Sequence, residues 1–201
     1  SRQTAEPAAP LAPRAGANGK QESIAIIGVG CRFPGGASDP ATFWGLLQSG
    51  TDATSEFPKG RWDMAAYYDP EPGKPGKVYT KRGAFLDDVE RFDAPFFRIS
   101  PVEATSMDPQ QRLLLEVGWE ALESAGQVVS RLGEARTGVF VGIFSNDYEQ
   151  LHRSSGDPAS VDIYSATGNG RAFAAGRLSY NLGLRGPSMA IDTACSSSLV
   201  A

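Results

Sequence analysis

Short apolar runs that predict buried strands alternate along this chain with longer segments that carry helix start and stop signals. Such alternation is typical of layered α/β folds, in which helices cover the faces of a sheet. The predicted strands occupy residues 23–30, 137–143 and 187–191. With 201 residues, 41% of them hydrophobic, the chain is long enough to form one domain with a real core. We therefore expect an α/β fold.

Two helices are predicted from an aspartate cap followed by a proline at the first helical position. Asp39-Pro40 opens a short helix over residues 41–48. Asp108-Pro109 opens the strongest helix, which we expect to run to about Ala125 and to stop at Gly126. Helical spacing predicts that its apolar face consists of Leu113, Leu114, Val117, Ala121 and Leu122.

A third helix is expected to begin at Asn169-Gly170, run through Leu182 and stop at Gly183. Small side chains follow it along its length and would let a neighbouring backbone approach closely. These are Ala172, Ala174, Ala175, Gly176 and Ser179.

Three further segments carry weaker signals. Residues 1–22 are rich in Ala, Pro and Gly and predict an interdomain linker. Residues 28–33 begin like a dinucleotide-binding loop, but Phe33 stands where the third glycine is required, so we reject that interpretation and expect Cys31 to line a packed loop. Residues 51–95 are expected to pack against the core because they hold many aromatic side chains.

Cys195 lies where the strand predicted at 187–191 would turn into a helix. Asp192 and Thr193 suit the turn, and the first turn of a helix has free N–H groups and a positive end that stabilise a thiolate. The neighbours Ala194, Ser196, Ser197 and Ser198 are small, so a bulky acyl thioester could approach the sulfur. The residues alone leave open whether Cys195 is a nucleophile or a small buried hydrophobic residue.

Composition excludes several classes of function. The net charge of -4, without a basic stripe, argues against nucleic-acid binding. The cysteines at 31 and 195 with the lone His152 make neither a disulfide framework nor a convincing metal site. No apolar run is long enough to span a membrane, and no signal peptide is found. We expect a cytoplasmic chain without cofactor or metal.

Several segments, taken together and in order, resemble the β-ketoacyl synthase (ketosynthase) domain of modular type I polyketide synthases, in the thiolase-like superfamily. The resemblance covers about Ser23 to Ala201. It rests on residues 24–28, 31–35, 43–44, 82–86, 92–97, 107–112, 175–180 and 192–198. It implies the N-terminal half of a layered α-β-α-β-α fold over residues 23–201. The helix that starts near Cys195 has only about two turns before Ala201, which also favours part of a longer domain.

The resemblance also implies a mechanism. Cys195 would be the catalytic nucleophile, and its backbone N–H would be one oxyanion-hole donor. It would take an acyl chain from the phosphopantetheine of an acyl carrier protein, and a decarboxylating malonyl-type extender would then attack the thioester. Implied partners are the carrier protein, the acyltransferase and other polyketide synthase domains, and a second copy of the chain in a homodimer.

The resemblance places two histidines and a second oxyanion donor downstream of the cysteine, so we expect these 201 residues alone not to complete condensation. Two alternatives stay open: a non-catalytic half-domain that needs a partner, and a thiol hydrolase, which needs a histidine near Cys195. We expect His152 to be a solvated surface residue. Residues 108–112 are expected to be structural, residues 167–170 to form a loop and helix cap, and Asp192 to be a turn residue.

Overall fold

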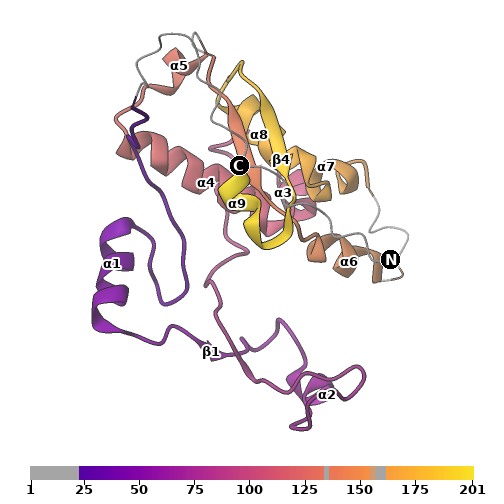
Figure 1. Ribbon diagram of the computed structural model, residues 1–201. Helices are drawn as coiled ribbons and strands as arrows, with labels where there is room; N and C mark the ends of the chain where they lie inside the picture. Colours follow the sequence, from indigo (N-terminus) through magenta and orange to yellow (C-terminus); the bar gives the residue numbers. More distant parts are fainter. Residues whose placement is uncertain (1–22, 134–135, 155, 157–161) are drawn as a thin grey trace, which may run out of the picture.

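The computed structural model describes residues 23–133, 136–154, 156 and 162–201, so the linker predicted over residues 1–22 lies outside the described residues. The order of elements is shown in Figure 1. They are α1 (Pro40–Ser49), β1 (Ser55–Glu56), α2 (Met64–Tyr67), β2 (Arg82–Gly83), α3 (Pro101–Ser106), α4 (Pro109–Ser124), α5 (Val129–Leu132), β3 (Val139–Gly142), α6 (Asp147–Ser154), α7 (Ser165–Asn169), α8 (Ala172–Asn181), β4 (Ser188–Ile191), the 3-10 turn η2 (Ala194–Ser196) and α9 (Ser197–Val200).

The centre of the molecule is a parallel pair of strands with a helix on each face. β3 pairs with β4 in the register Val139 to Ser188 through Gly142 to Ile191. Side chains alternate along β3, and Val139 and Val141 are buried in a cluster with residues of α8. Gly142 faces the other side, where α9 lies (Figure 1). This α/β arrangement confirms the strands predicted over 137–143 and 187–191, although β4 is only partly buried.

α4 packs against α8 and carries the second core cluster. The predicted cap is present: the Asp108 carboxylate accepts the Gln110 N–H at 2.8 Å, and the chain leaves the helix through Gly126 at φ +63°. The apolar face predicted for this helix is only half-buried, and Leu115, which that prediction omitted, is the buried leucine. It packs with the buried residues Ala94, Phe97, Ile99 and Met107.

α8 ends as predicted but does not begin as predicted. Gly183 stops it with φ +66°, and Ala174, Ala175 and Ser179 are buried. The predicted cap at Asn169 is wrong, because Asn169 is the last residue of the short helix α7. Its buried side chain donates to the carbonyls of Ser106 at 3.2 Å and of Ser165 at 2.8 Å, and therefore ties α7 to α3.

The strand predicted over residues 23–30 is wrong. No strand is found there among the described residues, and Ile24 and Ile26 are 99% and 86% exposed. The segment lies along α4, where a Cβ on Gly28 would come within 2.2 Å of the Ala121 carbonyl oxygen. Glycine therefore allows backbone-to-helix contact in place of sheet pairing. Cys31 follows as a buried loop residue, as predicted.

α1 forms as predicted, because the Asp39 carboxylate accepts the N–H groups of Ala41 and Thr42. The packing against the core expected of residues 51–95 is found only at the end of the segment. Ala94 is buried in the core and Phe92 packs against it, whereas an aromatic cluster forms a separate local centre. In this cluster Phe57 contacts Trp62 and Phe85, and Trp62 contacts Tyr67, with ring centroids 4.7 to 5.2 Å apart. Aromatic rings order this segment through one another.

Asp162 gives α7 a dependence on pH. The Ser106 hydroxyl donates to it at 2.9 Å, and with the Ser165 hydroxyl and the Tyr164 N–H it lowers the pKa of this carboxyl below its ordinary 3.8. A lowered pKa means that the stabilisation is complete above pH 3.8 and is lost as the pH falls further.

We expect Asp162→Asn to lower the free energy of unfolding near neutral pH and to change it less in acid. The measurement is urea unfolding of both proteins between about pH 6 and pH 3, and the difference between the two stabilities should narrow once the pH falls below 3.8. Asp87→Asn is the control, since Asp87 is exposed and has no hydrogen bond to any described side chain. A constant difference across the pH range would contradict this account.

Candidate active site

The parallel strands β3 and β4 end at the same edge of the sheet. The Ile143 N–H donates to the Ile191 carbonyl at 3.1 Å, so the pairing continues to the last residue of β4. The chain then leaves the sheet at Asp192. The carboxyl end of parallel strands is the usual place for a site in an α/β fold, because the loops that follow the strands converge there.

A tight turn joins β4 to the helix that follows. The Asp192 carboxylate accepts the Ala194 N–H at 3.1 Å, and the Ser197 hydroxyl accepts the Thr193 N–H at 2.9 Å and donates to the Ala194 carbonyl at 2.7 Å. Ala194 has a φ of +54°, a left-handed conformation that is strained for a residue with a side chain. These hydrogen bonds hold the strained residue directly before Cys195.

Cys195 lies at the outside of this turn, in η2, with an exposed side chain. Its backbone N–H makes no hydrogen bond to any described residue. An unused N–H in the first turn of a helix can receive a hydrogen bond acceptor from a ligand. The site therefore offers an accessible thiol and a free donor on the same residue. The strand-to-helix junction predicted for Cys195 is confirmed.

Gly142 allows the helix that follows Cys195 to lie on the sheet. A Cβ at Gly142 would lie 2.7 Å from the Ser198 nitrogen and 2.8 Å from the Ser197 carbonyl carbon, both backbone atoms. Sequence reasoning missed Gly142, although an isolated glycine within a predicted strand is a known sign of close backbone approach.

Sequence reasoning also missed Arg171, the residue before α8. One of its guanidinium nitrogens donates to the Asp192 carboxylate and to the Phe144 carbonyl, each at 2.6 Å. Asp192 is a turn residue, as predicted, and also a partner in this ion pair. No sequence pattern signals Arg171, because its two partners lie at the ends of two different strands.

His152 lies on α6 and is half-buried rather than fully solvated. Its ring packs edge-on against the ring of Tyr148, with the two ring centroids 4.6 Å apart. The polar segment 108–112 is structural, as predicted: Gln111 is buried, donates to the carbonyls of Thr167 and Gly170, and accepts from Arg177. The described part of residues 1–201 contains no group of side chains that could hold a metal ion and no helix that could span a membrane.

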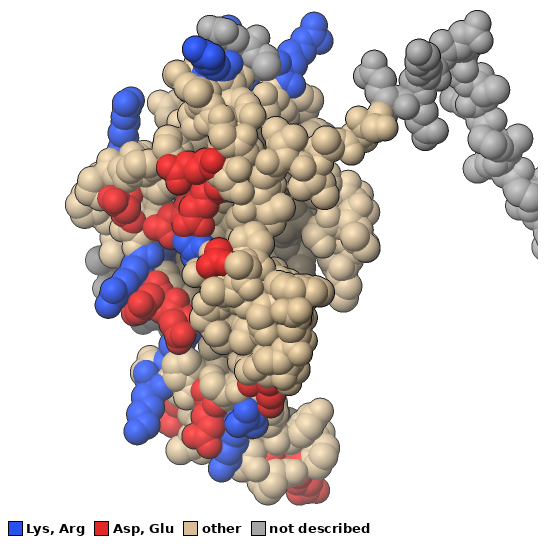
Figure 2. Space-filling model, turned by 90° about the vertical axis from the view of Figure 1, so that its left-hand side faces the viewer, with Lys and Arg blue, Asp and Glu red and all other residues tan. Residues whose placement is uncertain are grey.

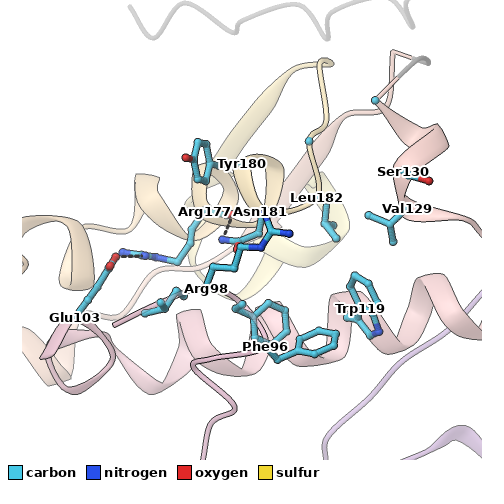
Figure 3. Close-up of a pocket in the computed structure, with 14 residues that line it drawn as sticks. Phe96, Arg98, Glu103, Trp119, Val129, Ser130, Arg177, Tyr180, Asn181 and Leu182 are labelled. Atoms are coloured by element: carbon cyan, nitrogen blue, oxygen red, sulfur yellow. Dashed lines mark hydrogen bonds and ion pairs between the residues drawn. The ribbon is translucent and has the colours of Figure 1, made fainter. Parts of the chain in front are cut away.

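A cavity of about 820 Å³ lies apart from Cys195, between α4, α5 and the end of α8. Figure 3 shows Trp119 and Phe96 on one side of it and Tyr180 on another, with the ion pair of Glu103 and Arg177 at one end. The residues that line the cavity do not include any residue of the turn that holds Cys195.

Acidic and basic side chains are mixed on the face shown in Figure 2, so this face offers no continuous basic stripe.

Comparisons with known proteins identify relatives of this chain. A family model described as "Beta-ketoacyl synthase, N-terminal domain" matches residues 21–201. The chain is 53% identical over 180 residues to a phenolphthiocerol/phthiocerol polyketide synthase polypeptide of Mycobacterium tuberculosis, covering 90% of this chain and 12% of that protein. It is also 53% identical over 181 residues to polyketide synthase GfsB of Streptomyces halstedii, covering 90% of this chain and 3% of that protein.

Two solved structures are similar in fold. The oxazolomycin ketosynthase domain OzmH KS7 of Streptomyces albus has a TM-score of 0.80 at 43% identity, over 87% of this chain and 30% of that chain. The ketosynthase from module 6 of the bacillaene synthase of Bacillus subtilis has a TM-score of 0.74 at 42% identity. The match covers 88% of this chain and 28% of that chain. These similarities confirm the α/β, thiolase-like fold, and the chain spans less than a third of either structure.

Proposed function

This chain belongs to the β-ketoacyl synthase family, as its N-terminal domain, and on that premise we propose that Cys195 is the acyl-accepting nucleophile of a polyketide-synthase condensation. The observation that carries the proposal is the turn after β4. It presents an exposed thiol and an unused N–H on the same residue, after a strained Ala194. A strand–turn–helix junction of this kind lifts a nucleophile out of the sheet edge.

The first half-reaction uses both groups that this turn offers. The Cys195 thiolate attacks the carbonyl carbon of an acyl thioester carried on the phosphopantetheine of an acyl carrier protein. The Cys195 N–H donates to the oxyanion that forms, and the carrier thiol leaves and takes up a proton. The product is an acyl thioester on Cys195.

In the second half-reaction a malonyl-type extender on a carrier loses carbon dioxide, and its carbanion attacks the acyl thioester on Cys195. The new carbon–carbon bond forms as the Cys195 thiolate leaves, which regenerates the nucleophile. A β-ketoacyl chain remains on the carrier. The partners of this proposal are the carrier protein, the acyltransferase and other synthase domains, and a second copy of the chain in a homodimer.

The test is to incubate the chain with an acyl N-acetylcysteamine thioester and to locate the added mass by peptide mapping. We expect one acyl group per chain on Cys195 and none on Cys31, which is buried. The thioester should persist without carrier-bound extender. Steady release of free acid would favour a thiol hydrolase instead, and a folded chain that gains no acyl group would contradict the nucleophile proposal for these residues and favour the non-catalytic half-domain.

A further inference from the structure

Arg171 connects the ends of the two central strands. Its Nη1 atom donates to the Phe144 carbonyl, just after β3, and to Oδ2 of Asp192, just after β4, each at 2.6 Å. The arginine itself is the cap residue of α8, the helix that covers one face of the sheet. One guanidinium therefore joins three segments of chain around the turn that carries Cys195.

The other oxygen of Asp192 continues this connection. Oδ1 accepts the Ala194 N–H at 3.1 Å. That N–H belongs to the residue whose φ of +54° sets the direction of the following peptide, and the following peptide contains the Cys195 N–H. A carboxylate held at both oxygens can keep a strained residue in one conformation, whereas a free carboxylate can rotate about its side-chain bonds.

We propose that Arg171 is a positioning residue for Cys195, acting through Asp192 on the left-handed backbone of Ala194. The inference rests on the proposed acylation of Cys195. It adds that the alignment of the Cys195 N–H with the developing oxyanion depends on a cation contributed by α8.

The exposure of the ion pair separates this role from a structural one. The side chains of Arg171 and Asp192 are 43% and 46% exposed. Exposed ion pairs contribute little to the stability of a fold, because water screens them and ordering the side chains costs entropy. Loss of Arg171 should therefore leave the thermal unfolding midpoint nearly unchanged while the turn loses its geometry.

The test uses Arg171→Met, Arg171→Lys, Asp192→Asn and the Arg171→Met/Asp192→Asn double variant of the whole chain. Hydrogen exchange of the Ala194 amide reports the turn directly, and the rate of Cys195 acylation by the acyl thioester reports its chemistry. We expect Arg171→Met to speed exchange and to slow acylation, each about tenfold. Arg171→Lys should restore most of the exchange protection of Ala194 and most of the acylation rate. The double variant should exchange no faster and be acylated no more slowly than Asp192→Asn, because both residues act along one path.

Arg153→Met is the matched control, since it removes the ion pair that the exposed Arg153 makes with Glu149 at 2.6 Å on α6, which takes no part in the cysteine turn. Unchanged Ala194 exchange in Arg171→Met would overturn the positioning role. Additive effects in the double variant would overturn the path through Asp192. A wild-type chain that gains no acyl group would overturn the proposed function, and Ala194 exchange would still decide the role of Arg171.

Discussion

Replacing Cys195 by alanine is expected to abolish acylation of the chain, with a loss of at least about a thousandfold in rate. The thiolate forms the bond to the acyl carbon, and no other described side chain offers a thiol at the surface, because Cys31 is buried. Cys195→Ser should fail nearly as completely, since a hydroxyl without an adjacent base is a weak nucleophile at neutral pH. The measurement is the acyl-adduct mass after incubation with the acyl thioester.

Cys31→Ala is the control for this prediction. It removes the other thiol from a buried loop position and should leave the amount of adduct on Cys195 close to that of the wild type. Circular dichroism spectra of the two Cys195 variants should match that of the wild type, since Cys195 is exposed and its removal leaves no cavity. An adduct that persists in Cys195→Ala, at Cys31 or at a serine of the same turn, would show that the nucleophile is assigned wrongly.

Gly142→Ala is expected to have the second largest effect, because it affects both stability and acylation. The new methyl group would collide with backbone atoms of Ser197 and Ser198, which cannot rotate away as a side chain could. Either α9 moves off β3 or the strand bends, and overpacking of this kind costs about 1 to 3 kcal/mol. Since α9 begins directly after the turn that holds Cys195, the oxyanion donor should move with it.

The expected result is a lower free energy of unfolding together with a slower rate of acylation, while alkylation of Cys195 by iodoacetamide is retained, because that reaction needs only an exposed thiol. Gly176→Ala is the matched control: it makes the same chemical change within α8, at a position where a Cβ would meet nothing within 4 Å. Alanine is the better helix former by about 1 kcal/mol, so this variant should be at least as stable as the wild type. Equal behaviour of the two variants would contradict the role given to Gly142.

Features that depend on neighbouring residues could be predicted from the sequence. The caps of α1 and α4 were predicted because each aspartate binds N–H groups within three residues of itself. The turn into Cys195 was predicted for the same reason, since Asp192 accepts from Ala194. The position of the candidate nucleophile therefore followed from local chemistry, and the family resemblance added its role.

Features that depend on distant partners could not be predicted in this way. Residues 23–30 have the composition of a buried strand, but the structure places them along α4, where Gly28 and Gly30 approach the helix backbone. Apolar composition alone does not distinguish these two arrangements. The role of Arg171 could not be predicted, because it depends on Phe144 and Asp192, which become neighbours of Arg171 only when β3 and β4 pair.

The separate aromatic cluster has a consequence for spectroscopy. The chain has three tryptophans, and each lies in a different part of the fold. Trp44 is on the exposed side of α1, and Trp62 lies in the aromatic cluster. Trp119 contacts the ring of Phe96 edge-on and packs against the core cluster that contains Leu115 of α4. Intrinsic fluorescence therefore contains three independent reporters, and variants that keep one tryptophan at a time would follow the first helix, the cluster and the core separately during unfolding.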